Sequence, residues 1–151
     1  MPRCVRYLMI LAGLCLALPL RAAEWRETQD LPTVLQEAQA KGRYVYLAFL
    51  GLEWSVASRK WWQEVGQQPE FLKFADERMI LVLANGTARK LPKEEEAAYQ
   101  ALVQHYDVQA YPAFYILAPD GSVLLQHGTT PASPAQYLQA LDTLLVPLSP
   151  Q

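Results

Sequence analysis

Residues 43–62, RYVYLAFLGLEWSVASRKWW, change pattern at Gly51. Before the glycine, Arg43 to Leu50 is a short, almost continuous apolar run of aromatic and branched residues, which predicts a strand buried on both faces. After it, apolar side chains recur at helical spacing, which predicts a helix that begins at Ser55. The positions on the inner side of this helix are Ser58, Trp61, Trp62 and Val65.

The segments around this centre alternate between helix and strand. Asp30 to Lys41 predicts an amphipathic helix that Asp30 can cap and Gly42 can end. A restart at Pro69 predicts one or two further helical turns, and Met79 to Ala84 predicts a second buried strand. The inner positions of the two helical segments are Leu31, Val34, Leu35 and Ala38, then Phe71, Leu72 and Phe74.

The C-terminal half predicts a helix, a hairpin and a last helix. Pro92 and the carboxylates after it predict a helix start, with Ala98, Ala101, Leu102 and His105 on its inner face. Pro119-Asp120-Gly121 separates Ala113–Leu117 from Ser122–Gln126, as expected of a β-hairpin. Ser133 can cap the last helix, which carries Tyr137, Leu138, Leu141, Leu144 and Leu145. This order predicts an α/β fold in which a mixed sheet of parallel strands and an antiparallel C-terminal hairpin has helices on both faces.

The N-terminus has the layout of a secretory signal. Arg3 and Arg6 precede an apolar stretch from Tyr7 to Leu20, and small residues follow at Ala22 and Ala23. The stretch has 14 residues, whereas a membrane-spanning helix needs about 20. We therefore expect residues 1–22 to be a cleaved signal peptide, with the cut after Ala22 or Ala23 and no stable membrane span afterwards. Residues 23–148 would form one domain, 149–151 a tail, and the protein would be periplasmic or secreted.

Composition restricts the partners of the mature chain. Removing the signal leaves 129 of the 151 residues and 10 of the 13 basic side chains against 15 acidic ones, a formal net charge of −5. An acidic chain without a basic patch does not favour nucleic acid. Both cysteines, Cys4 and Cys15, lie in the signal, so the mature chain would have no disulfide and no thiolate. We expect no metal and no cofactor, since the two histidines are far apart in the sequence.

The element order and four local features resemble the thioredoxin-like family over residues 25–146. The features are the strand leading through Gly51 to Trp54, the helix from Ser55, the segment Gln67-Gln68-Pro69-Glu70-Phe71, and Tyr111-Pro112 before the hairpin. The last two resemble the exported branch of the family. The resemblance implies a thioredoxin-like three-layer fold.

The resemblance also shows where this chain departs from its family. Alignment on Trp54 places Ser55 and Ser58 where the family has the two cysteines of its Cys-x-x-Cys motif. That chemistry needs one thiolate and a second, resolving thiol, and a serine hydroxyl supplies neither at neutral pH. Many members also have a buried carboxylate six residues before the first cysteine, where this chain has Phe49. The sequence therefore predicts no catalytic residues and no thiol-disulfide oxidoreductase activity.

A binding surface is predicted from the same alignment. The resemblance implies that Pro112 is cis and faces the helix that begins at Ser55, and that Tyr111 offers its backbone to an extended peptide. Trp54, Ser55, Ser58, Tyr111 and Pro112 are the expected binding residues. For the two serines the alternative is that they only cap the helix. A serine hydrolase would need a base near Ser55, but His105 and His127 are not expected there.

Three functions remain open from the sequence. The first is a redox-inactive binding module for a peptide or partner protein. The second is a structural accessory subunit of an envelope assembly that keeps the old site for stability. The third and weakest is a member of a thiol-disulfide pathway, or another enzyme, that acts without cysteines of its own. Exposure of Trp54 and Tyr111 in one cleft would favour the first, and their burial the second.

Overall fold

The computed structural model describes residues 22–76, 78–87, 91–128 and 133–145. Both cysteines, nearly all of the expected signal peptide and the expected tail lie outside these ranges. The described chain forms a single five-stranded sheet with the strand order β1-β3-β2-β4-β5. The strands are β1 Trp25–Glu27, β2 Tyr44–Leu50, β3 Met79–Asn85, β4 Ala113–Leu117 and β5 Val123–His127. The helices are α1 Leu31–Lys41, α2 Val56–Trp61, α3 Pro69–Asp76, α4 Lys93–His105 and α5 Pro134–Leu145, with a 3₁₀ turn Thr28–Asp30 and a π-helix η2 Trp62–Gly66.

The sheet is mixed, as the sequence predicts. Strand β3 pairs in parallel with β1 and β2, whereas β4 is antiparallel to both β2 and β5. Strand β2 is central and every one of its residues is buried, which confirms the strand predicted from the apolar run before Gly51. The predicted hairpin of β4 and β5 is also present, with an irregularity in register near Ile116.

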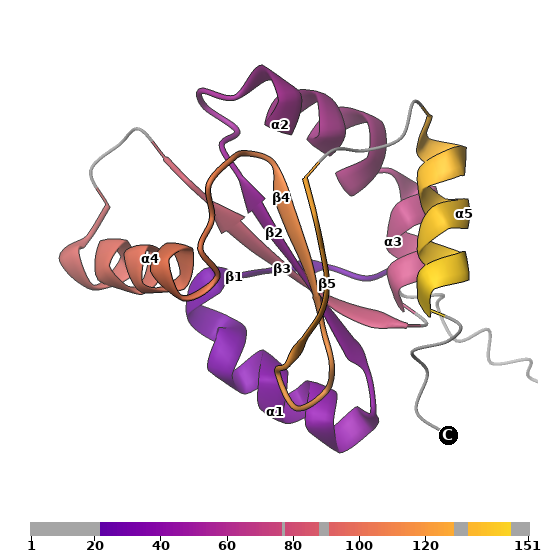
Figure 1. Ribbon diagram of the computed structural model, residues 1–151, viewed down its shortest axis with the longest axis horizontal. Helices are drawn as coiled ribbons and strands as arrows, with labels where there is room; N and C mark the ends of the chain where they lie inside the picture. The colour runs from indigo at the N-terminus through magenta and orange to yellow at the C-terminus, as the bar shows by residue number, and fades with distance from the viewer. Residues whose placement is uncertain (1–21, 77, 88–90, 129–132, 146–151) are drawn as a thin grey trace, which may run out of the picture.

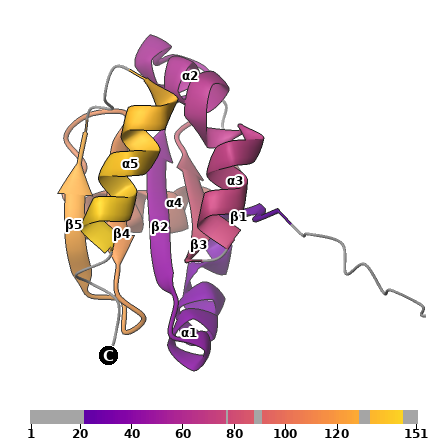
Figure 2. The ribbon, with the colours of Figure 1, turned by 90° about the vertical axis from the view of Figure 1, so that its right-hand side faces the viewer.

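Helices cover both faces of the sheet and give three layers. Helices α2, α3 and α5 lie on one face, and α1 and α4 lie on the other (Figures 1 and 2). Because successive side chains of a strand point to opposite faces, β2 supplies both cores. Tyr44, Tyr46, Ala48 and Leu50 enter the core under α2, α3 and α5, and Val45, Leu47 and Phe49 enter the core under α1 and α4.

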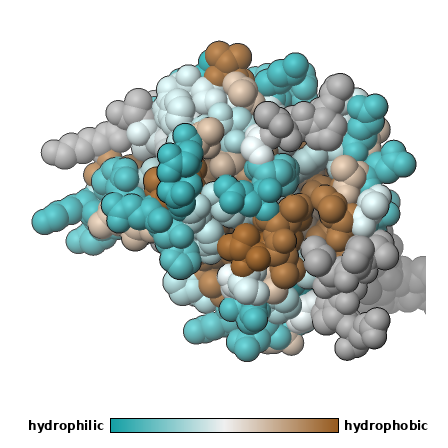
Figure 3. Space-filling view, viewed as in Figure 1, coloured by the Kyte–Doolittle hydropathy of each residue, from teal (hydrophilic) through white to brown (hydrophobic). Residues whose placement is uncertain are grey.

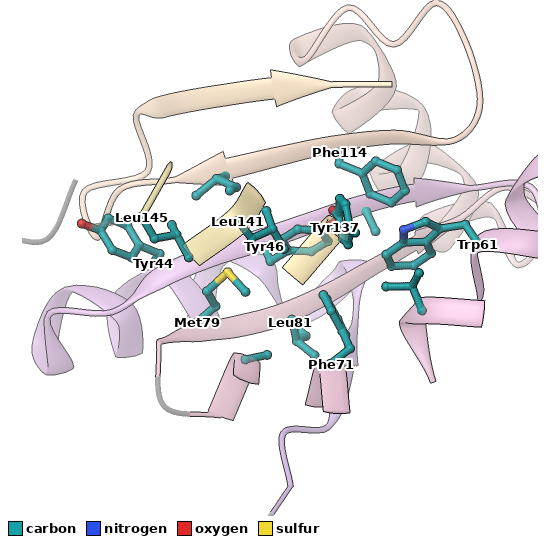
Figure 4. Close-up of a cluster of buried hydrophobic side chains, with 14 of the residues drawn as sticks. Tyr44, Tyr46, Trp61, Phe71, Met79, Leu81, Phe114, Tyr137, Leu141 and Leu145 are labelled. Atoms are coloured by element: carbon teal, nitrogen blue, oxygen red, sulfur yellow. The ribbon is translucent and has the colours of Figure 1, made fainter. Parts of the chain in front are cut away.

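The core under α2, α3 and α5 is built from aromatic rings that lie edge to face or stacked. Trp61 is 2% exposed, and its ring centroid lies 4.5 Å from that of Phe114 and 5.8 Å from that of Phe71. Figure 4 shows these side chains beside Tyr46 and Tyr137. The hydroxyls of Tyr46 and Tyr137 are hydrogen-bonded to each other inside this core. Burial raises the pKa of both tyrosines above the usual value.

The ends of α1 and α5 follow the usual rules for helix capping only in part. Gly42 ends α1 in the left-handed conformation with φ 61°, where glycine carries no steric cost. Asp30 occupies the N-cap position of α1 but its side chain makes no capping hydrogen bond. Ser133 does cap α5, since its hydroxyl oxygen accepts from the backbone N–H of Gln136 at 3.3 Å.

Two further features differ from the sequence prediction. The inner face of α4 is formed by Tyr99, Leu102, Val103 and Tyr106, whereas Ala98, Ala101 and His105 are exposed. The predicted face is thus wrong by one residue, about 100° around the helix, because two tyrosines bury more apolar surface than two alanines. Strand β1 was not predicted, because three residues are too few to show a periodicity.

The edge strand β5 is the most exposed strand of the sheet. Val123 and Leu124 are exposed large apolar side chains on this strand, and Leu144 is exposed on α5. Figure 3 shows apolar surface gathered over β5 and the neighbouring part of α5. The helices therefore leave this edge of the sheet uncovered in the described part of the chain.

An ion-pair cluster links β1 to α1. The Glu37 carboxylate accepts from Arg26 and from Lys41, each at 2.6 Å, and its side chain is 25% exposed. The hydrogen bonds to Arg26 and Lys41 lower the pKa of Glu37 to about 2. The cluster therefore stabilises the fold above the unfolded pKa and loses its effect as the pH falls toward the folded pKa.

Glu37→Gln is expected to flatten the acid limb of the stability curve. Between about pH 5 and about pH 2 the wild type should lose on the order of 1 kcal/mol that the variant does not lose, a small value because the cluster is partly exposed. Urea unfolding at several pH values measures the difference. Glu95→Gln, an exposed change on α4, is the control. Identical acid limbs for wild type and Glu37→Gln would contradict a lowered pKa at Glu37 in the folded state.

Candidate functional site

The loop from Gly51 to Ser58 is held by hydrogen bonds within itself. The carbonyl of Gly51 accepts from the backbone N–H of Trp54 at 3.2 Å and of Ser55 at 2.7 Å. The hydroxyl oxygen of Ser58 accepts from the N–H of Gly51 at 3.1 Å, which closes the loop from the other side. This loop carries the chain from the end of β2 into α2, as the sequence predicts.

The two serines support this loop through hydrogen bonds to backbone N–H groups. The hydroxyl oxygen of Ser55 accepts from the N–H of Ser58 at 3.2 Å and so caps α2. Ser58 is fully buried with 0% exposure, and its hydroxyl is already bonded to Gly51. The capping interpretation of the sequence is therefore confirmed for Ser55, and the Ser58 side chain does not reach the surface.

Trp54 is the most prominent side chain of the site. It is 50% exposed, and its indole N–H donates to the carbonyl of Gly86 at 3.1 Å. Its ring lies over Gly51, where an added Cβ would come within 2.4 Å of the indole. Glycine is therefore required at position 51 for the indole to lie where it does.

Tyr111 and Pro112 lie beside Trp54. The rings of Trp54 and Tyr111 meet edge to face with their centroids 4.8 Å apart. The peptide bond between Tyr111 and Pro112 is cis, which confirms what the resemblance implies. The structure thus brings together two segments that are 57 positions apart in the sequence.

A hydrogen bond from α4 fixes the ring of Tyr111. The hydroxyls of Tyr99 and Tyr111 are 2.8 Å apart, and burial, reinforced by this hydrogen bond, raises the pKa of Tyr99 well above its usual value. The backbone N–H and C=O of Tyr111, by contrast, make no hydrogen bond with the described part of the chain. An extended peptide could pair with these two groups.

An open depression of about 300 Å³ is lined by Pro112 and by residues on either side of it in the chain. Its walls come from the residues before β4, from the end of β5 and from Gly128. His127 stands at its edge, stacked on Phe114 with a centroid distance of 4.9 Å and with Nε2 3.3 Å from the Tyr137 hydroxyl. The depression therefore adjoins the Trp54–Tyr111 pair without including it.

Sequence reasoning missed the residues that hold the two segments in place. Asn85 accepts from the N–H of Leu52 at 3.1 Å through its side-chain oxygen, and Gly86 accepts from Trp54. In the sequence, Asn85-Gly86 predicts a turn after the strand Met79–Ala84 and gives no sign of these two contacts. Tyr99 was missed because the inner face of α4 was predicted one residue away. The signal that could have found it is the tyrosine itself, since a large aromatic side chain on a helix buries more apolar surface than an alanine.

The surroundings of the two histidines and of the acidic side chains can be compared with what a hydrolytic or metal site needs. Neither histidine is hydrogen-bonded to Ser55. The ring of His105 packs on Tyr106, and the ring of His127 packs on Phe114. No group of three His, Cys, Asp or Glu side chains that could hold a metal occurs among the residues described. Within the same residues, no helix has both the length and the apolar character needed to cross a membrane.

Comparisons with known proteins agree with the fold. A comparison with curated proteins finds no match. Among solved structures, the chain is similar to an oxidoreductase, DsbH, with a TM-score of 0.75 and 21% identity over 83% of this chain and 86% of that one. A thioredoxin from Thermus thermophilus has a TM-score of 0.60 and 22% identity, covering 83% of this chain and 89% of its own. The oxidised C-terminal domain of DsbD from Neisseria meningitidis has a TM-score of 0.57 and 18% identity, covering 80% and 98%.

These likenesses are below 25% identity and therefore concern the fold alone. The match to a family model is more specific, since the model for a thioredoxin-like domain matches residues 31–145. This range contains the loop of Trp54, the cis bond before Pro112 and four of the five strands. The chain belongs to the thioredoxin-like domain family.

Proposed function

We propose that this protein is an exported, redox-inactive thioredoxin-like domain that holds an extended peptide or a segment of a partner protein. The observation that carries the proposal is the pair formed by Trp54 and Tyr111. Trp54 is half exposed beside a backbone segment, at Tyr111, whose polar groups have no partner in the described chain. A bound strand would pair with that backbone while the indole covers its side chains.

The serines have a supporting role in this proposal. Ser55 caps α2 and Ser58 anchors Gly51, so both hold Trp54 in position without reacting. Neither cysteine of the sequence lies near these positions in the chain, because Cys4 and Cys15 precede residue 22. Removal of residues 1–22 on export to the periplasm or beyond would leave a chain with no sulfur nucleophile.

The accessory-subunit alternative predicts a different surface. A site kept only for stability would bury its aromatic side chains, since exposed aromatic rings contribute little to folding. Trp54 instead keeps half of its surface in solvent while its indole N–H is anchored to Gly86. This arrangement favours the binding module.

Trp54→Ala is expected to weaken partner binding more than it weakens folding. Loss of an aromatic anchor at the centre of an interface typically costs about 2 kcal/mol or more, which is roughly a 30-fold rise in Kd. The cleaved protein would be used to capture partners from the envelope fraction. The affinity of an identified, purified partner would then be measured for wild type and variant by calorimetry.

The matched control is Glu95→Ala, on α4, which removes an exposed side chain outside the site. It should leave Kd unchanged. Equal affinities for Trp54→Ala and Glu95→Ala would place the interface elsewhere and support the accessory-subunit alternative.

The intact mass of the exported protein tests the signal peptide. We expect the mature chain to start at Ala23 or Glu24.

A further inference from the structure

A second hollow lies between helices α3 and α5, separate from the Trp54–Tyr111 surface. Figure 2 shows the two helices side by side on one face of the sheet. The hollow has a volume of about 300 Å³ and a mainly apolar surface. Buried Val65 and Phe71 line it together with Leu138, and Pro134 and Ala135 from the first turn of α5 complete the wall. We call it the α3–α5 groove.

The size of the groove suits apolar side chains of a larger ligand. Small-molecule pockets are usually between about 300 and 1,000 Å³, so this groove is at the lower limit for an enclosed small ligand. Its walls are helices, whose backbone groups are bonded internally, and no strand edge is available for pairing. Affinity must therefore come from side chains, as in the binding of an amphipathic helix to a groove between helices.

Carboxylates flank the apolar floor. Glu64 and Glu70 line the groove from η2 and from the first turn of α3, and both are exposed. Neither makes an ion pair within the described chain, although Lys60 and Lys73 lie about one turn away from them in the sequence. The positive ends of α3 and α5 amount to about half a charge each and do not cancel two full carboxylates. The rim therefore favours cationic groups.

The wall that carries Glu64 is irregular and well anchored. Residues Trp62–Gly66 form a π-helix, and such segments occur frequently at functional sites. The indole N–H of Trp25 donates to the carbonyl of Gly66 at 2.8 Å, which ties this wall to the start of β1. Phe71, which lines the groove, stacks on Tyr137 with a centroid distance of 6.5 Å (Figure 4). The groove thus exists before any partner arrives.

We propose that the α3–α5 groove docks a basic amphipathic helix of a partner protein. An apolar side chain of that helix enters between Phe71 and Leu138, and lysine or arginine residues beside it pair with Glu64 and Glu70. This proposal is independent of the peptide surface at Trp54, because the two surfaces share no residue.

A defined peptide tests the proposal. The probe is a labelled synthetic helix of about 15 residues with leucines on one face and lysines beside them. Two comparison peptides have the same leucine face with glutamates in place of lysines, or the same composition in scrambled order. Fluorescence anisotropy with the full mature protein gives each Kd, and backbone amide shifts locate the contact.

The lysine peptide should bind, and each comparison peptide should bind at least about tenfold more weakly. The glutamate peptide loses the two favourable charge pairs, and the scrambled peptide loses its continuous apolar face. Glu64→Gln with Glu70→Gln should raise Kd about three- to tenfold. The control is Glu94→Gln with Glu95→Gln on α4, which removes the same charge from the opposite face of the sheet and should leave Kd nearly unchanged. The largest amide shifts should be at Val65, Ala135 and Leu138.

Several results would overturn the proposal. These are absence of binding, equal affinity for the lysine and glutamate peptides, equal effects of the two double variants, and amide shifts centred on Trp54 and Tyr111. Sedimentation that reveals a dimer through this groove would assign it to a second copy. Binding of a cationic detergent below its micelle concentration, without binding of the peptide, would assign it to a small amphiphile. Shifts centred on Trp54 and Tyr111 would also support the proposed peptide surface, whereas the other results leave the test of Trp54→Ala unaffected.

Discussion

Trp61→Ala is expected to lower the free energy of unfolding by about 3–5 kcal/mol, the usual range for removing a buried tryptophan. Trp61 is 2% exposed and lies among Phe71, Phe114 and Tyr137, whose rings come from three different elements. Removing the indole opens a cavity between α2, β4 and α5. The surrounding rings are fixed by one another and can relax only partly into the space.

Urea unfolding followed by circular dichroism measures the loss. Val56→Ala is the control within the same helix, because Val56 is 72% exposed, and it should change the free energy by no more than about 0.5 kcal/mol. The indole N–H of Trp61 has no hydrogen-bond partner among the described residues. Trp61→Phe should therefore cost clearly less than Trp61→Ala, because it removes this unpaired donor and keeps an aromatic ring. A loss of less than about 1.5 kcal/mol for Trp61→Ala would contradict the central place of this residue in the core.

Ser55→Cys combined with Ser58→Cys is expected to create a disulfide between these two positions. The two positions lie across the first turn of α2, where the N–H of Ser58 already reaches the side chain of Ser55 at 3.2 Å. Two cysteines at this spacing can meet the geometry of a disulfide. The loss of the Ser58 hydroxyl leaves the N–H of Gly51 without its strong acceptor, which should cost about 1–2 kcal/mol.

Thiol titration before and after oxidation measures closure, and insulin reduction measures exchange. The wild type and the control, Ser55→Ala with Ser58→Ala, should show neither, whereas the cysteine variant should show both. Its exchange rate should remain below that of a thioredoxin assayed beside it. The reason is that Phe49 is fully buried against Tyr106 and Tyr115 and supplies no proton acceptor. A folded variant that cannot be oxidised would mean that the alignment on Trp54 is wrong.

Much of the fold could be predicted from local patterns because its central elements are long and regular. Strand β2 has seven consecutive buried residues, and α1 buries the predicted positions Leu31, Val34 and Ala38. The short β1 and the π-helix η2 leave no such pattern, and their formation depends on pairing with β3 and on packing around Trp25 and Trp61. The face of α4 was misjudged because apolar spacing alone does not weigh the size of Tyr99 against that of Ala98.

The sequence by itself determined the loop from Gly51 to Ser58, the turn Pro119-Asp120-Gly121 of the hairpin and the absence of cysteine at Ser55 and Ser58, since each depends on residue type at a fixed spacing. Only the tertiary structure decided that Ser58 is enclosed, that Trp54 is half exposed against Tyr111, and that Tyr99 and Gly86 hold that pair. The α3–α5 groove likewise depends on two helices that are distant in the chain. The physical reason is that hydrogen bonds and ring contacts between distant segments arise only when the sheet brings the ends of its strands together, and no local pattern encodes that distance.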